Sequence, residues 1–98
     1  MLVHSVFFWL APELSGEQVT EFESRLRGLL EIPAIRHGFV GRPAGTRRPV
    51  VDCTYSYALT LVFEDLAGHD VYQVHPLHQA FVKECASNWV KVVIYDAE

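Results

Sequence analysis

The stretch LVHSVFFWL, residues 2–10, carries apolar or aromatic side chains on both of its alternating faces. Successive side chains of a strand point to opposite faces, so His4, Val6 and Phe8 share one face and Phe7 lies on the other. A strand with two apolar faces must be covered on both sides. The sequence therefore predicts a central β-strand over residues 2–10.

A helix is expected after this strand. Ser15 and Gln18 match the capping box that begins many helices, and apolar residues then recur at helical spacing until Ile32 and Pro33 end the pattern. The other expected elements are a strand near residues 35–42, a flexible loop over 41–49, a strand near 55–63, a helix over 66–74, a helix from 76 to about 87 and a strand over 90–95.

This order of elements predicts an α+β fold of the ferredoxin-like kind, a four-stranded antiparallel sheet with helices on one face. Residues 1–98 leave room for a single domain. The other face of the sheet would carry bulky apolar residues that nothing in the chain covers, and such a patch marks an interaction surface. We therefore expect a homodimer in which two sheets face each other and close an α/β barrel.

The composition argues against several partners. The net charge is −4, and only Arg42, Arg47 and Arg48 gather, so nucleic acid is not expected. These arginines either recognise an anionic group at the mouth of a pocket or are solvated.

No apolar run approaches the length of a membrane span, so no membrane is expected either. Cys53 and Cys85 read as free thiols in a reducing compartment, and the expected location is cytoplasmic.

Several segments resemble the stress-responsive dimeric α/β-barrel (Dabb) family. They are HSVFFWL at the start, IPA around Pro33, YALTLVFED, and above all DVYQVHPLHQAF followed by NWVKVVIYD. The Tyr-x-x-His-Pro-x-His block that begins at Tyr72 is the most specific part. The resemblance covers nearly the whole chain and implies ferredoxin-like monomers that pair through their sheets.

The resemblance extends to plant polyketide cyclases of the olivetolic acid cyclase type. These enzymes close a linear polyketide by an aldol condensation in a pocket between sheet and helices. The resemblance implies catalytic roles for Tyr72 and His78 and a pocket position for His4. A further pocket histidine of these cyclases falls at Tyr57, so this sequence departs from the pattern there.

The residues themselves support a similar interpretation. His78 is expected to point toward the sheet, where a histidine with a pKa near neutrality can take a proton from a carbon next to a carbonyl. Tyr72 would orient it or donate a hydrogen bond to a developing enolate, with His4 as a third candidate. Alternatively, these are partly buried polar groups that satisfy one another. The expected pocket residues are Val6, Phe8, Phe22, Tyr57, Leu59, Phe81 and Val82.

No metal site and no cofactor are expected from the sequence. His75 and His78 are three residues apart, which is close enough on a helix for two ligands of one ion. The spacing supplies no third ligand, however. His75 precedes Pro76 and is expected to have a structural role, as a helix cap or in packing.

The resemblance leaves three functions open. The first is a lyase or cyclase that abstracts a proton from a carbonyl compound, with a small apolar or polyketide-like ligand. The second is a non-catalytic stress-response dimer that binds a ligand or is purely structural, and the third is a cofactor-independent monooxygenase. A cavity with converging polar groups would favour an enzyme or a binder, whereas a core filled by Phe8, Phe22 and Phe81 would favour a structural module.

Overall fold

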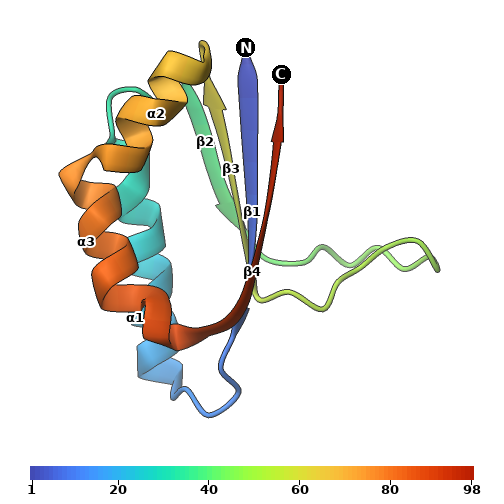
Figure 1. Cartoon of the computed structure of the whole chain (residues 1–98). Helices are drawn as coiled ribbons and strands as arrows, with labels where there is room; N and C mark the ends of the chain where they lie inside the picture. Colours follow the sequence, from blue (N-terminus) through green and yellow to red (C-terminus); the bar gives the residue numbers. More distant parts are fainter.

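The chain folds into a four-stranded antiparallel sheet with three α-helices packed on one face (Figure 1). A computed structural model describes all residues 1–98. The elements are β1 (Leu2–Leu10), α1 (Gly16–Gly28), β2 (His37–Gly41), β3 (Tyr57–Phe63), α2 (Leu66–Val74), α3 (Pro76–Cys85) and β4 (Trp89–Ala97), with short 3₁₀ turns at Leu29–Glu31 and Ala86–Asn88. The predicted ferredoxin-like α+β fold is confirmed.

The strand order is β2-β3-β1-β4, so β1 lies inside the sheet as its two apolar faces predicted. His4 is paired with Leu61 of β3 on one side and with Asp96 of β4 on the other. This register places segments from both ends of the chain side by side at one end of the sheet.

Local sequence signals explain where the helices begin. The Ser15 hydroxyl accepts a hydrogen bond from the Gln18 amide (3.1 Å), and the Gln18 side chain accepts one from the Ser15 amide (2.8 Å). At the junction of α2 and α3, Nδ1 of His75 accepts a hydrogen bond from the Leu77 amide (3.1 Å), and Pro76 occupies the first turn of α3. The structural role expected for His75 is confirmed as a helix cap.

The sheet strands differ from the predicted bounds in instructive ways. The strand β3 begins at Tyr57 and not near 55. Just before it, the Ser56 amide donates a hydrogen bond to the Phe8 carbonyl (2.7 Å), and side-chain hydroxyls make further bonds to β1. The Trp9 indole donates to the Thr54 hydroxyl (2.9 Å), and the Leu10 amide donates to the Ser56 hydroxyl (2.9 Å). The strand β2 is shorter than expected, β4 continues to Ala97, and the loop between β2 and β3 spans residues 42–56.

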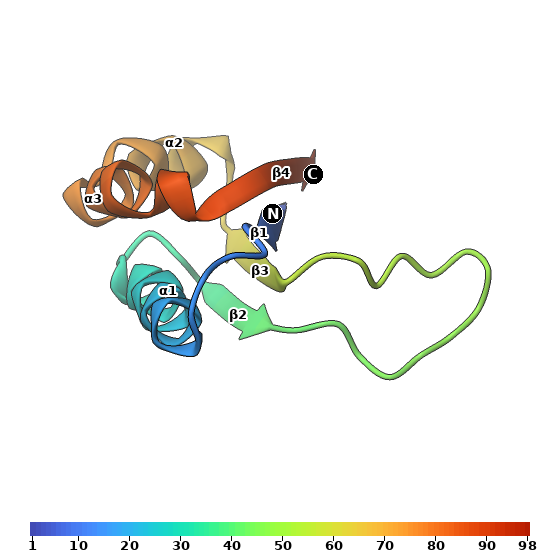
Figure 2. The same cartoon turned by 90° about the horizontal axis from the view of Figure 1, so that it is seen from below.

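The two faces of the sheet have different surroundings. The helices cover the inner face, and the loop 42–56 projects on the opposite side (Figure 2). On the outer face the Phe7 ring packs edge-on against Tyr55 and Tyr95, at centroid distances of 5.1 and 6.3 Å. Tyr95 and Phe39 are exposed by 65% and 64% of their surface. An uncovered aromatic face is therefore present, as predicted. None of the helices has the length and apolar character that a bilayer span requires.

Candidate functional site

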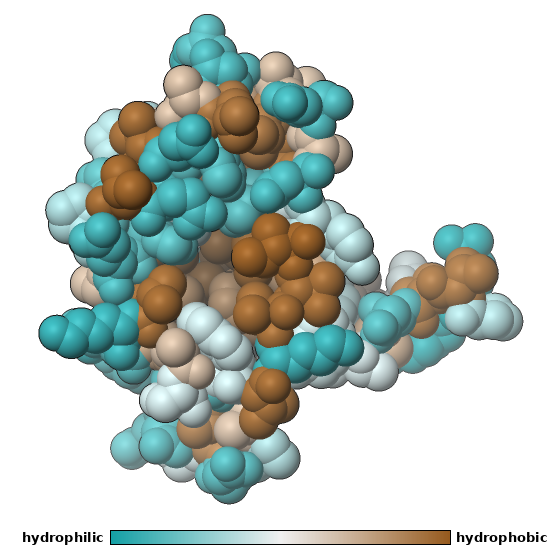
Figure 3. Space-filling model, in the orientation of Figure 1, coloured by the Kyte–Doolittle hydropathy of each residue, from teal (hydrophilic) through white to brown (hydrophobic).

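A cavity of about 170 Å³ lies between the helical layer and the sheet, beside β4. Figure 3 shows the surface hollowed there, with hydrophobic atoms at its border. The three candidate catalytic residues of the sequence, His4, Tyr72 and His78, all line it. The rest of its wall is mainly apolar and comprises Val6, Phe8, Leu29, Leu59, Gln73, Phe81, Val82, Trp89, Val92 and Ile94.

Two residues expected in the pocket, Phe22 and Tyr57, do not line this cavity. Phe22 on α1 is fully buried and packs against Phe8 and Phe81, at ring centroid distances of 5.4 and 5.8 Å. The Tyr57 hydroxyl donates a hydrogen bond to Oε1 of Glu23 (2.7 Å). The helix α1 thus fills one part of the space between the layers, and the cavity is confined to the part beneath α2 and α3.

The tautomer of His78 follows from its backbone contact. Its Nδ1 lies 3.0 Å from the carbonyl oxygen of Gln73. A carbonyl only accepts hydrogen bonds, so Nδ1 carries the proton and Nε2 keeps a lone pair. Burial lowers the pKa of His78 below the ordinary histidine value, and the backbone hydrogen bond only partly opposes this. At neutral pH His78 is therefore an uncharged base.

Tyr72 lies directly against this histidine. The ring centroids of Tyr72 and His78 are 4.7 Å apart, and the Tyr72 side chain is 1% exposed. Burial raises the pKa of Tyr72 far above the ordinary tyrosine value. The phenol consequently stays protonated, so it can donate a hydrogen bond but cannot act as a base.

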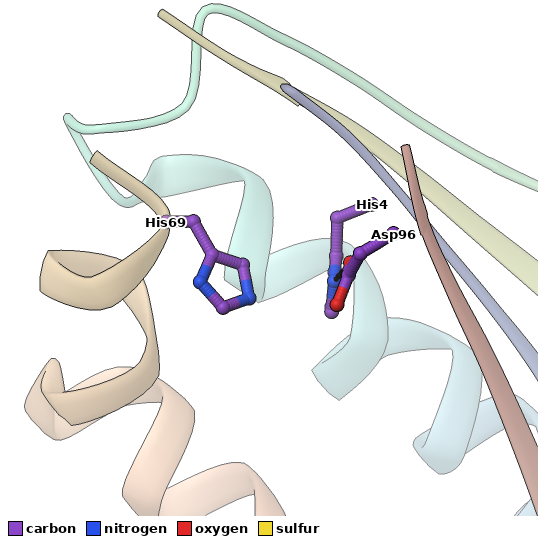
Figure 4. A group of neighbouring side chains, drawn as sticks. All are labelled: His4, His69 and Asp96. Atoms are coloured by element: carbon purple, nitrogen blue, oxygen red, sulfur yellow. Dashed lines mark hydrogen bonds and ion pairs between the residues drawn. The ribbon is translucent and has the colours of Figure 1, made fainter. Parts of the chain in front are cut away.

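His4 is held by a partner that the sequence did not reveal. Its Nδ1 lies 2.5 Å from Oδ1 of Asp96, across the β1–β4 pair. The ring of His69, on α2, packs edge-on against His4 at a centroid distance of 5.1 Å (Figure 4). The last strand was predicted to end at Tyr95, two residues before its end at Ala97, and His69 belongs to no recognised motif. The pairing of β1 with β4 and the packing of α2 on the sheet bring the three together.

The loop arginines do not reach this site. Arg42 donates a hydrogen bond to Glu23 (3.2 Å) and lies over the Tyr57 ring, while Arg47 donates to the carbonyls of Ala44 and Thr46 in its own loop. Their loop projects on the side of the sheet opposite the helices (Figure 2). The structure therefore favours solvated or structural arginines over anion recognition at the cavity mouth.

A second hollow, of about 240 Å³, lies on the outer face of the sheet. It is larger than the inner cavity, but its wall contains no histidine, and its lysine is occupied: Nζ of Lys91 lies 4.5 Å from the centroid of the Trp9 ring. The three candidate catalytic residues of the sequence line the inner cavity and not the outer hollow, so we take the inner cavity as the candidate site.

Comparisons with known proteins agree with this fold. The sequence model of the "Stress responsive A/B Barrel Domain" matches residues 2–98. Among curated proteins, none matches the chain. Similar solved structures include a Dabb family protein with a ferredoxin-like fold from Mesorhizobium loti (24% identity, TM-score 0.81, covering 99% of this chain and 94% of that one).

Two further structures share the fold. One is a dimeric ferredoxin-like protein from Thermobifida fusca (22% identity, TM-score 0.81, covering 98% of this chain and 88% of that one). The other is a hydroxynitrile lyase from Passiflora edulis (22% identity, TM-score 0.80, covering 98% and 90%). Since the family model spans nearly the whole chain and the fold agrees, the protein belongs to the stress responsive A/B barrel domain family.

Proposed function

We propose that the domain is a small lyase-type enzyme that removes a proton from the carbon next to the carbonyl of a small apolar compound. One observation carries the proposal: a single apolar cavity holds an uncharged histidine, His78, beside a protonated tyrosine, Tyr72. A base and a hydrogen-bond donor in contact within apolar walls are the two groups that enolate formation needs.

In this reaction Nε2 of His78 takes the proton from the α-carbon. The electron pair that is left moves onto the carbonyl oxygen, and the Tyr72 hydroxyl donates a hydrogen bond to that oxygen. The apolar surroundings strengthen this hydrogen bond, because charge is screened less there than in water. His4, fixed by Asp96, lines the same cavity and contacts Tyr72, at a ring centroid distance of 5.7 Å.

The size of the cavity limits the ligand. Pockets for drug-sized molecules typically measure about 300–1,000 Å³, whereas this cavity holds about 170 Å³. That favours a compact carbonyl compound over an extended polyketide. The Passiflora edulis hydroxynitrile lyase supports the proposal, because it is a lyase with the same fold.

The proposal is tested by following exchange of the α-protons of butanone, a small apolar ketone, for deuterium from solvent by NMR. We expect the protein to accelerate the exchange above the buffer rate, and we expect a bulky ketone that exceeds the cavity not to compete. A protein that binds butanone without accelerating exchange would contradict the enzyme. That result would favour the alternative, a non-catalytic binding module.

The pH dependence of this exchange is a separate prediction. The reaction needs His78 without its proton, and burial lowers the pKa of His78. The rate should therefore be full at neutral pH and fall on acidification, with a midpoint below the ordinary histidine value of about 6.5. The measurement is the exchange rate between about pH 5 and 8. A midpoint above that ordinary value would contradict the assignment of His78 as the base.

We further propose that the uncovered outer face pairs with the same face of a second copy. The exposed aromatic residues there support this, as does the dimeric description of the Thermobifida fusca protein. Val93 lies on this face, opposite Phe7 in the sheet, and is half-buried in the monomer. Glutamate at this position would bury an unpaired charge in the dimer but leave the monomer intact.

We therefore expect Val93→Glu to weaken self-association at least about tenfold. The matched control is Val71→Glu, which places the same charge on the exposed surface of α2. Light scattering during size-exclusion chromatography measures the molecular mass of each variant over a range of concentrations. A wild-type protein that stays monomeric, or equal masses for the two variants, would contradict the proposed interface.

A further inference from the structure

We propose that His4, His69 and Asp96 form a binding site for one divalent transition-metal ion of the zinc class. Each side chain offers one ligand atom, and these atoms lie within 4.8 Å of one another. Figure 4 shows His69 pointing from α2 toward His4 and Asp96 on the sheet. The site differs from the His75–His78 pair that the sequence suggested, and it does not depend on the proposed proton transfer.

The donor set fits this class of ion. Imidazole nitrogen suits zinc, cobalt, nickel and copper ions, and zinc sites in proteins commonly combine histidines with a carboxylate. Magnesium and calcium would instead require mostly oxygen ligands. The three ligands come from β1, α2 and β4, so the packed fold and not a mobile loop determines their spacing.

Nε2 of His69 carries a lone pair on the side of the cluster, where a metal ion would take the place of the Gln73 amide. Its Nδ1 lies 3.1 Å from Oδ1 of Asp70, and a carboxylate accepts hydrogen bonds, so Nδ1 carries the proton. The Gln73 amide nitrogen lies 3.3 Å from Nε2 and donates to it. The lone pair that accepts this hydrogen bond is the one that a metal needs. A carboxylate on the far nitrogen is also the usual outer partner of a metal-bound histidine.

The His4–Asp96 contact supplies the other two ligands. With Nδ1 and Oδ1 2.5 Å apart, a proton lies between them. Metal binding at Nδ1 requires His4 to carry its proton on Nε2 instead, so the neutral ring changes tautomer and the ion takes the bridging position. Metal–ligand bonds of about 2.0–2.1 Å place tetrahedral ligands roughly 3.3 Å apart. The pair must therefore separate slightly and His69 must approach. Asp96 can move, since its side chain is 43% exposed, whereas His4 is fixed at 3%.

The site adjoins the cavity, because His4 belongs to both. Three protein ligands leave a fourth position of a tetrahedral ion for water or a small ligand. Metal binding would therefore also tie α2 to the two strands that form the cavity wall, and it would stabilise the folded state.

The test is titration of the untagged protein, freed of metal with a chelator, with cobalt(II) or zinc(II) alone. We expect one ion per chain by calorimetry, and visible absorption from bound cobalt in a low-symmetry site. His69→Gln and Asp96→Asn should each weaken binding at least about tenfold, since even outer partners of a metal contribute that much. Both residues are partly exposed, so the variants are expected to fold, which circular dichroism checks.

The matched control is His37→Gln, which removes an exposed histidine on β2 and should bind as tightly as the wild type. Equal loss in all three variants would indicate adventitious surface binding and overturn the proposal. So would a wild-type protein that binds no ion, or unchanged affinity in His69→Gln. No ketone is present in this titration, so its outcome is separate from that of the exchange assay.

Discussion

Replacing His78 by glutamine is expected to slow α-proton exchange of butanone by about 10²–10⁴-fold, the range that a general base contributes. Glutamine is similar in size to histidine, and its amide can still donate a hydrogen bond to the Gln73 carbonyl that now accepts one from Nδ1. It has no group that can take up a proton near neutral pH. The variant should keep the cavity but lose the chemistry.

The control for this prediction is His37→Gln, an exposed histidine on β2 that does not line the cavity. Its exchange rate should equal that of the wild type. The acidic inflection of the pH profile should disappear in His78→Gln alone. If butanone exchanges its α-protons as fast with His78→Gln as with the wild type, His78 is not the base, even if the ketone binds in the cavity.

Replacing Phe22 by alanine is expected to lower the free energy of unfolding by about 3–5 kcal/mol, as for other buried phenylalanines. The side chain is fully buried, and its ring contacts those of Phe8, Phe81, Tyr57 and Trp89. Small domains have only about 5–15 kcal/mol of stability in total. The change would therefore consume a large part of it.

Urea denaturation measures this loss. Val71→Ala, at a position on α2 that is 54% exposed, should change the free energy of unfolding by no more than about 0.5 kcal/mol. Because Phe22 does not line the cavity, the folded fraction of Phe22→Ala should still bind butanone. If Phe22→Ala lowers the free energy of unfolding no more than the control does, the neighbouring rings must fill the space of the missing phenyl group, and the prediction is wrong.

Signals that act between near neighbours allowed the fold to be predicted from the sequence. The alternation in residues 2–10 gave the bounds and both faces of β1. The pattern of Ser15 with Gln18 predicted the start of α1, and His75 with Pro76 predicted the junction of α2 and α3. Each of these signals depends on residues that are close together in the sequence, so the sequence alone reveals it.

The parts that escaped prediction depend on register between distant segments. Tyr57 was expected in the pocket, but the sequence could not tell whether α1 or the cavity lies above its side chain. Likewise, the approach of His4 to Asp96 follows only from the β1–β4 pairing. The packing of α2 on the sheet then adds His69. No local pattern encodes these distances.

The pairing of β1 with β4 also has a consequence for how the protein matures on the ribosome. His4 and Asp96 are separated by 92 positions. The backbone groups on one edge of β1, the first strand, therefore lack hydrogen-bond partners until β4, the last strand, has been synthesised. Contacts that are so distant in sequence slow folding. A nascent chain that lacks β4 has neither Val92 and Ile94 in the cavity wall nor Asp96 beside His4. Both the cavity wall and the proposed metal site are therefore incomplete until β4 has paired with β1.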